Sequence, residues 1–425
     1  MFKFLNSNII SDGIYSILGS FVQRFSFFLI TVFLANNLLK EDFGNITFIR
    51  STIDSILIFS GFGLATAVNK FVPESSKKSE TLNYIFSALL ILMFNVILII
   101  LLFLLTENFY AYRTNTYGIT SSVINICIII FISSSFNRLL ASTLSAFQKF
   151  KNLSFGIMIS SIISLPISFF FFNKKDFVNI FIGYAIIEFI LLFILLIFIN
   201  RIFSNRNYNL RTIKYNTFKD YFYKTFIFAL PAFLSGLLVV PVMWFARLML
   251  INSDSGALHL ADFEVGFQLM AIAAFFPTAI SAIILPKISR HNKSKHKYLN
   301  TLKLSSLFVI ITSIFIVVIF ILFGDIILGI YGGGFNDKYV YNLLIISSSF
   351  LVINNIIGKI IASRDKMWCG FIFNVIWAMC FILLSHFFIN QNFGSLSLAY
   401  SFLIAHIFHF FLQSFFSIKL LKNIK

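Results

Sequence analysis

Ionisable side chains inside apolar segments are the residues of this sequence best able to do chemistry. A charged group near the centre of a bilayer costs on the order of 2.5–3.5 kcal/mol on insertion scales, so such groups usually face a bundle interior or a water-filled cavity. Because cations outnumber acids in this set, we expect the membrane interior to attract an anionic ligand. The set lies within or at the ends of long apolar runs and comprises Arg24, Arg50, Asp54, Arg138, Glu188, Arg247 and Lys359.

Among the intramembrane cations, Arg24 is expected to lie deepest in the membrane, and it is the central residue of the predicted site. At 100° per residue, Ser16, Ser20 and Arg24 fall near one helix face, and Thr31 falls on the same face. A polar stripe of this kind suits a water-lined cavity. The alternative is an arginine whose donors bind backbone carbonyls of a neighbouring helix.

Two acids could take part in the same site. Arg50 and Asp54 are four residues apart, so their side chains can pair on one face of a helix. That pair is either structural and self-neutralising or part of a site for substrate or a coupling ion. Glu188, beside Tyr184 in the middle of its run, is a candidate proton carrier or the buried partner of an arginine.

The remaining intramembrane cations lie nearer the ends of their runs, where a long side chain can extend to the interface. Arg138 and Arg247 are candidate substrate ligands with Arg24 and Arg50, and interfacial anchoring is the alternative reading for each, as for Lys359. The histidines and cysteines of the apolar runs lack companion acids, so we read them as packing residues. We predict no metal, no cofactor and no catalytic set.

The elements that position these groups are apolar helices. Mean hydropathy is +0.91, with 59% hydrophobic and 12% charged residues. A helix needs roughly 20 apolar residues to cross about 30 Å of hydrocarbon, and spanning backbone must form its hydrogen bonds within the segment. We therefore predict an all-α polytopic membrane protein with about twelve transmembrane helices, near 14–36, 45–70, 83–105, 119–145, 153–173, 178–200, 225–251, 263–286, 302–323, 339–361, 368–389 and 395–418.

The distribution of basic residues predicts the orientation of the chain. The 33 Lys and Arg residues outnumber the 16 Asp and Glu residues, which in a soluble protein would indicate nucleic acid as a partner. With the N-terminus inside, most of these cations fall in cytoplasmic loops, as the positive-inside rule requires. Both termini are therefore expected in the cytoplasm. Cytoplasmic loops that face anionic lipid account for the net charge of +17, so we predict membrane lipids and not nucleic acid as partners.

A basic hydrophilic stretch divides the chain into two halves. We predict an N-terminal lobe over 1–200, a cytoplasmic linker over 201–224 and a C-terminal lobe over 225–425. Short segments correspond weakly between the halves, such as 40–44 after the first run and 261–266 after the seventh. Because each half holds an even number of runs, the two are expected to be parallel repeats with the substrate between them.

Several local patterns along the chain carry a family resemblance. Residues 38–44 match the pattern Leu-x-x-Glu-x-Phe-Gly, and residues 61–67 resemble Gly-Leu-x-x-Ala. Further patterns lie at 147–151, 230–231, 276–279, 285–290 and 331–332. Their order and spacing together resemble the Wzx-type O-antigen and polysaccharide flippases of the MATE-like multidrug/oligosaccharidyl-lipid/polysaccharide superfamily.

The resemblance implies two six-helix lobes around a central cavity in the bacterial cytoplasmic membrane. It implies a substrate of undecaprenyl-pyrophosphate-linked oligosaccharide, an O-antigen or capsular repeat unit, moved from the inner to the outer leaflet. It also implies a glycan polymerase and a chain-length regulator as partners. Related flippases carry cavity-facing cations on the first, second and seventh helices, which Arg24, Arg50 and Arg247 match by helix only.

Guanidinium groups suit such a substrate because they offer phosphate a bidentate, permanently charged fork. We expect alternating access, with Asp54 or Glu188 available for ion or proton coupling. The alternatives are a multidrug exporter of the same superfamily, a lipid II or teichuronic acid flippase, and a membrane glycan polymerase. Because the predicted outer loops are too short for the domain of such an enzyme, we expect a transporter and not an enzyme.

Overall fold

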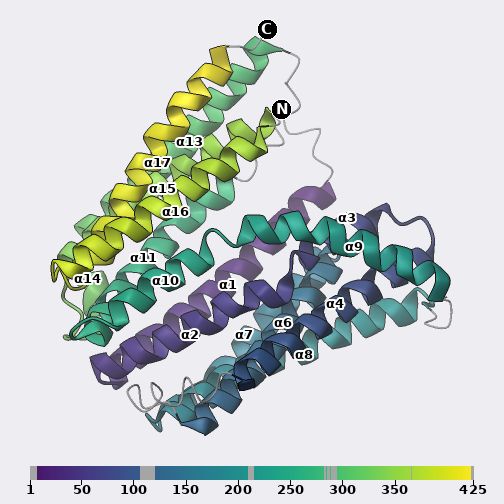
Figure 1. The fold of residues 1–425 in the computed structure, drawn as a ribbon, viewed down its shortest axis with the longest axis horizontal. Coiled ribbons are helices and arrows are strands. Elements are labelled where there is room, and N and C mark those ends of the chain that lie inside the picture. Colours follow the sequence, from purple (N-terminus) through teal and green to yellow (C-terminus); the bar gives the residue numbers. More distant parts are fainter. Residues whose placement is uncertain are drawn as a thin grey trace. The chain divides into compact units, whose positions relative to one another are not determined.

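In the described part of the chain, the computed structural model is helical and has no strand (Figure 1). It describes residues 7–105, 120–208, 215–281, 284, 288, 294–364 and 366–422. The helices are α1 (Ser7–Asn37), α2 (Lys40–Gly61), α3 (Leu64–Glu74), α4 (Lys78–Leu105), α6 (Ser121–Ala146), α7 (Phe150–Phe172), α8 (Phe177–Asn205), α9 (Tyr215–Gly236), α10 (Val240–Ile251), α11 (Gly256–Ser281), α13 (Lys295–Leu322), α14 (Gly324–Gly329), α15 (Lys338–Ser363), α16 (Met367–Asn390) and α17 (Leu396–Lys422). The all-α prediction is confirmed.

The helices form two compact units, which we describe separately. Unit 1 contains Met1–Asn37 and Ile49–Val240, and unit 2 contains Leu38–Phe48 and Pro241–Lys425. The chain therefore enters unit 2 after α1, returns to unit 1 within α2 and enters unit 2 again at the start of α10. These contacts place α9 in unit 1. The division into lobes over 1–200 and 225–425 stays a prediction.

Unit 1 is built around α7 and α8. Helix α7 packs against α1 and α8, α8 packs against α6, and α3, α4 and α9 pack against one another beside α6. Small residues allow the close approach of α1 and α7, because a Cβ atom at Gly19 would lie 3.0 Å from Ser154. This packing brings polar positions of α2, α6 and α8 to the interior of the unit.

Unit 2 has α11, α15 and α17 at its centre, with α13, α14 and α16 packed around them. The start of α2 also packs here and explains the pattern at 38–44. The Phe43 side chain is fully buried with its ring 5.3 Å from that of Phe335. A Cβ atom at Gly44 would lie 2.0 Å from the backbone oxygen of Ala257, so only glycine fits.

Among the described helices, ten are long and apolar enough to cross a membrane, and counting the bent pair α2–α3 as one span makes eleven. The pair corresponds to the predicted second span and bends by 42°, with Phe62 and Gly63 in left-handed conformations (φ 39° and 68°). The predicted seventh span, 225–251, is instead divided. A turn at 237–239 separates α9 from α10, and α10 has only 12 residues.

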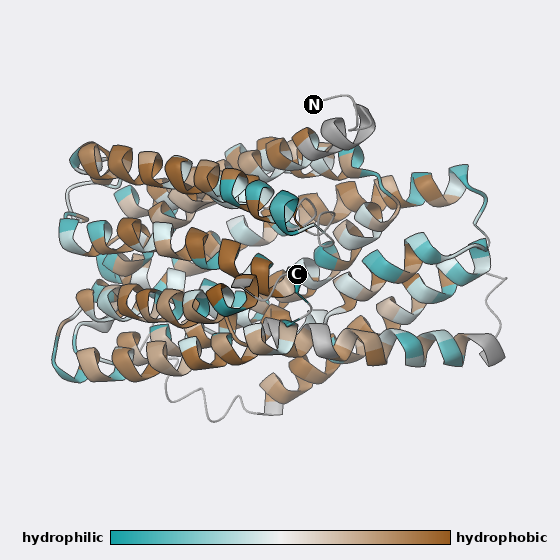
Figure 2. Ribbon diagram, turned by 90° about the horizontal axis from the view of Figure 1, so that it is seen from above, coloured by the Kyte–Doolittle hydropathy of each residue, from teal (hydrophilic) through white to brown (hydrophobic). Residues whose placement is uncertain are grey.

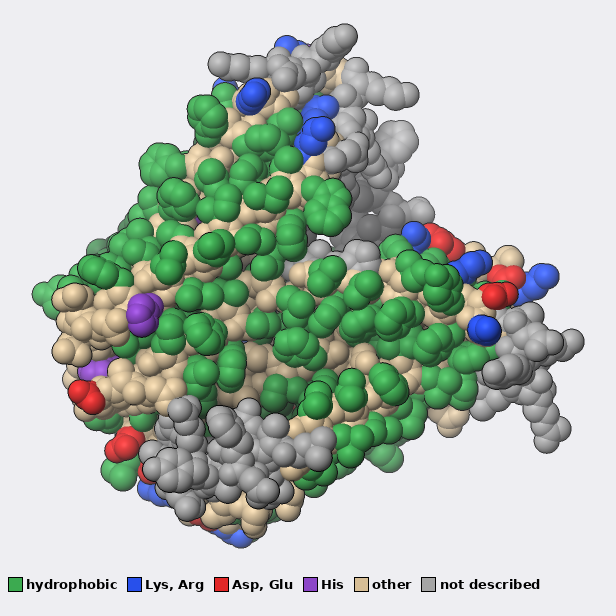
Figure 3. Space-filling view, in the orientation of Figure 1, with side chains coloured by type: hydrophobic (Ala, Val, Ile, Leu, Met, Phe, Trp, Pro, Cys, Tyr) green, Lys and Arg blue, Asp and Glu red, His purple; other side chains and the backbone are tan. Residues whose placement is uncertain are grey.

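Apolar residues dominate the helices along most of their length (Figure 2). Many large apolar side chains are exposed, such as Phe94, Ile162 and Phe415. In the space-filling view, hydrophobic side chains cover the visible helices while Lys, Arg, Asp and Glu gather toward helix ends (Figure 3). A soluble protein rarely exposes apolar area on this scale. The chain is a multi-pass membrane protein whose exposed apolar side chains face lipid.

Candidate functional site

Unit 1 contains a polar cavity of about 430 Å³ between α1, α2, α6, α7 and α8. Apolar side chains form much of its wall, and polar groups of α2, α6 and α8 converge on it. The cavity brings together four predicted site residues, two cations and two acids, from three different helices. The polar lining residues are Gln23, Arg50, Asp54, Ser134, Asn137, Arg138, Tyr184 and Glu188.

Arg50 is held in this cavity by aromatic rings. Its guanidinium carbon lies 4.2 Å from the centroid of the Phe27 ring on α1 and 4.8 Å from that of the Tyr184 ring on α8. Such contacts contribute roughly 0.5–2 kcal/mol each, depending on how far the cation is desolvated. A guanidinium has five N–H donors, so Arg50 can keep these ring contacts and still donate to an anionic ligand.

Asp54 pairs with Arg138 and not with Arg50. Its Oδ1 lies 3.9 Å from Nη2 of Arg138, and about half of each side chain is exposed, 54% and 48%. The same-helix pair with Arg50 that the spacing allowed does not form in the described structure, because Arg50 turns toward the rings on α1 and α8. A pair this long and this exposed is weak, so a ligand can displace either member.

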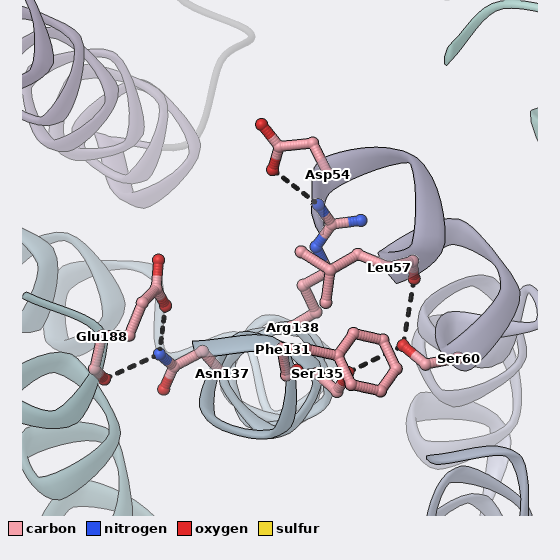
Figure 4. Close-up of polar contacts among 8 residues, drawn as sticks. All are labelled: Asp54, Leu57, Ser60, Phe131, Ser135, Asn137, Arg138 and Glu188. Carbon is pink, nitrogen blue, oxygen red and sulfur yellow. Dashed lines mark hydrogen bonds and ion pairs between the residues drawn. The ribbon is translucent and has the colours of Figure 1, made fainter. Parts of the chain in front are cut away.

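Glu188 is held firmly by Asn137, a residue that the sequence analysis did not single out. The Asn137 amide nitrogen donates to the Glu188 carboxylate at 2.8 Å and to its backbone carbonyl at 2.9 Å. Figure 4 shows Asn137 and Arg138 leaving α6 toward different helices, α8 and α2. A polar residue directly before Arg138 in an apolar run was the available signal.

A smaller cavity of about 180 Å³ shares Leu57 and Arg138 with the first and lies at the α2–α3 bend. Ser60 ties this part of α2 to α6, because its hydroxyl lies 2.8 Å from that of Ser135 (Figure 4). The hydroxyl of Ser60 also donates to the Leu57 carbonyl at 3.1 Å. These bonds help to satisfy backbone and side-chain groups where the helix is interrupted.

In two parts of the chain, the described structure places acids beside the intramembrane cations, while the surplus over the whole membrane interior stays a prediction. Within the cavity, Arg50 and Arg138 face Asp54 and Glu188, so the formal charges balance. Elsewhere, Arg247 of α10 is buried and paired through Nε and Nη2 with Glu264 of α11.

Glu264 is not among the intramembrane charges predicted from the sequence. Helix α11 begins at Gly256 and carries both Asp262 and Glu264 in its candidate span, whereas the predicted span of 263–286 excluded Asp262 and placed Glu264 at its very end. Within unit 2, Oδ1 of Asp262 forms an ion pair with Nζ of Lys40 at 2.6 Å. The role of Arg247 as a substrate ligand stays a prediction, and its present contacts tie α10 to α11.

Two further predicted cations lie outside the group that lines the cavity. Arg24 is exposed on α1, and its neighbour Gln23 is the residue that contributes to the wall. Lys359 of α15 is half-buried in unit 2 and donates to the Ser281 hydroxyl at 2.5 Å. The predicted role of Arg24 in substrate binding remains untested by this geometry.

The fold is that of a class of membrane transporters. An inward-facing multidrug resistance MATE family transporter of the MOP superfamily superposes with a TM-score of 0.75 at 11% identity, over 96% of this chain and 100% of that one. The outward-facing form of a multidrug resistance MATE family transporter gives 0.70 at 12% identity, over 98% and 96%. A MOP superfamily transporter from Pyrococcus furiosus, described as having a binding pocket of reverse polarity, gives 0.69 at 12% identity over the same shares.

The family is established by sequence. The profile of the family described as "Polysaccharide biosynthesis protein" matches residues 9–292 of the 425. The chain therefore belongs to the polysaccharide biosynthesis protein family, whose members include the Wzx-type flippases, and it has the fold of MOP superfamily transporters. No curated protein matches the sequence.

Proposed function

We propose that this protein is a flippase for undecaprenyl-pyrophosphate-linked oligosaccharide, such as an O-antigen or capsular repeat unit. It would move this substrate by alternating access from the inner to the outer leaflet of a bacterial cytoplasmic membrane, with both termini in the cytoplasm. Family membership and the transporter fold support transport connected with polysaccharide synthesis. A polymerase and a chain-length regulator that use the exported unit would be its partners.

One observation carries the choice of substrate. A single cavity contains a guanidinium stacked on two rings and a second guanidinium whose acid partner is 3.9 Å away. A diphosphate offers several anionic oxygens, so it can accept hydrogen bonds from Arg50 and Arg138 together. It would compete with Asp54 for Arg138 because the existing pair is long and half-exposed.

The same competition supplies a means of coupling. When the diphosphate engages Arg138, Asp54 loses its cation partner and becomes available to bind a coupling ion. Glu188 is less suited to this task because Asn137 fixes its carboxylate. We therefore assign coupling to Asp54 and a positioning role to Glu188.

The test is export of surface glycan in a strain that lacks its own flippase. We expect Arg50→Ala and Arg138→Ala each to reduce surface glycan at least tenfold at equal membrane levels, and the lysine variants to retain part of it, since lysine keeps charge but loses the fork. Arg24→Ala and Arg24→Lys test the remaining predicted ligand. Lys219→Ala, at an exposed position of α9, is the matched control. Full export by a well-inserted Arg50→Ala, Arg138→Ala double variant would exclude this site.

The two acids in the cavity favour a second candidate, a multidrug exporter of the same superfamily. A charge-balanced cavity can also accept a cationic drug once Asp54 leaves Arg138. Cells that express the protein would then gain resistance to cationic dyes and antibiotics, and Asp54→Asn would abolish it. Glycan export without any gain of resistance would reject this candidate.

A further inference from the structure

Unit 2 contains an apolar groove that the proposed transport does not use. It encloses about 480 Å³ between α13, α15 and α17. Leu302, Ile356 and Ile360 at its base belong to a buried hydrophobic cluster. Since all three helices are candidate membrane spans, the groove lies within the thickness of the bilayer, where a hydrocarbon chain is the available apolar occupant.

Cationic groups mark one end of this groove. Lys303 lines it and is exposed. Arg364 caps α15 about one turn beyond Ile360, and its guanidinium carbon lies 4.1 Å from the ring centroid of the buried Tyr298. Among the described residues, Nε and Nη2 of Arg364 have no hydrogen-bond partner. Both of these guanidinium nitrogens are buried, so this end of the groove has one exposed cation, Lys303, and beyond it a guanidinium whose buried donors the described part of the chain leaves unused.

We propose that the groove is a binding site for an anionic phospholipid of the surrounding membrane. One acyl chain occupies the apolar part, and the headgroup phosphate lies at Lys303 and Arg364. Basic pockets between transmembrane helices are suited to anionic headgroups, and guanidinium binds phosphate through a bidentate fork. An acyl chain without an anionic headgroup would leave both cations without a partner.

The site is independent of the proposed transport chemistry. None of its residues lines the cavity of unit 1, so failure of one proposal leaves the other standing. The main competing occupant is the isoprenoid tail of a lipid-linked substrate. Competition with undecaprenyl phosphate, described below, separates the two.

The first experiment measures lipid binding to the purified full-length protein by native mass spectrometry. Phosphatidylglycerol and phosphatidylcholine with the same acyl chains are titrated in parallel. We expect phosphatidylglycerol to bind more tightly, and Lys303→Gln and Arg364→Gln each to weaken it about fivefold, equivalent to about 1 kcal/mol per cation near an anionic surface. Lys303→Arg should restore binding. Lys297→Gln, which removes an exposed cation of the same helix outside the groove, should change nothing.

A second experiment fills the groove. Ser306→Trp places a large ring among the lining residues, whereas Leu307→Trp places the same ring on an exposed face of α13. We expect the first to reduce retention of phosphatidylglycerol and the second to leave it unchanged, with similar thermal unfolding of both.

Three results would overturn the proposal. The first is equal binding of the two phospholipids by the wild-type protein. The second is insensitivity of phosphatidylglycerol binding both to the Lys303→Gln, Arg364→Gln double variant and to Ser306→Trp. The third is displacement of phosphatidylglycerol by undecaprenyl phosphate at equimolar concentration, which would assign the groove to the substrate tail.

Discussion

Asn137 of α6 holds Glu188 of α8 at two points, the carboxylate at 2.8 Å and the backbone carbonyl at 2.9 Å. One amide therefore connects two transmembrane helices and fixes the direction of an acid at the cavity wall. The next residue, Arg138, reaches toward α2, but its Nη2 lies 3.9 Å from Oδ1 of Asp54, which makes a long and weak pair. The two acids of the cavity thus differ in freedom, although both lie mid-helix and looked equivalent in the sequence.

Loss of the Asn137 amide should destabilise unit 1. Asn137→Ala removes both interhelical bonds to Glu188 and takes one donor from its carboxylate, so we expect a loss of about 1–3 kcal/mol in unfolding free energy. Thermal unfolding in detergent measures this. Asn37→Ala is the control, because the Asn37 amide donates to the Phe33 carbonyl of its own helix. Equal stability of the two variants would show that the α6–α8 link contributes nothing.

The Asp54–Arg138 pair should matter for transport and little for stability. Both side chains are half-exposed, so a double-mutant cycle with Asp54→Asn and Arg138→Gln should give a coupling below about 1 kcal/mol in unfolding. Export in the same variants should fall steeply, since both groups take part in the proposed cycle. A large coupling in stability together with unchanged export would make the pair structural.

The Arg247–Glu264 pair should behave in the opposite way. Side-chain exposure is only 9% and 14%, so Arg247→Met or Glu264→Gln alone leaves a buried charge without its partner and should cost ~3–5 kcal/mol. The joint Arg247→Met, Glu264→Gln variant should be more stable than either single variant. Thermal unfolding of the four proteins tests this, and additive losses would contradict it.

Replacing either of two glycines of α2 by alanine should have opposite effects on stability. Gly44→Ala would place Cβ against the Ala257 carbonyl and force the start of α2 away from α11. We expect poor membrane insertion or a lowered unfolding temperature. Gly61→Ala meets nothing within 4 Å and should be neutral or stabilising by ~0.5–1 kcal/mol. Comparable losses in both variants would show that helix flexibility, and not the close contact, selects Gly44.

Hydropathy was sufficient to predict the number and approximate limits of most helices. Eleven of the predicted spans correspond to candidate spans, including the bent pair α2–α3. The bend itself depends on left-handed backbone at Phe62 and Gly63, which composition does not encode. The predicted seventh span is divided into α9 and α10, and hydropathy did not indicate this because the apolar run continues across the turn at 237–239.

The sequence by itself determined that this protein lies in a lipid bilayer, because its apolar runs are near bilayer length. In lipid, such runs can satisfy their backbone hydrogen bonds as spanning helices. The sequence also indicated most of the ionisable residues that enter the membrane, although it left out Asp262 and Glu264 of α11. Only the tertiary structure decided which charges meet. A guanidinium on a long flexible side chain can turn to either neighbouring helix, so helix packing and not chain spacing directed Arg138 to Asp54, Arg50 to its two rings and Arg247 to Glu264.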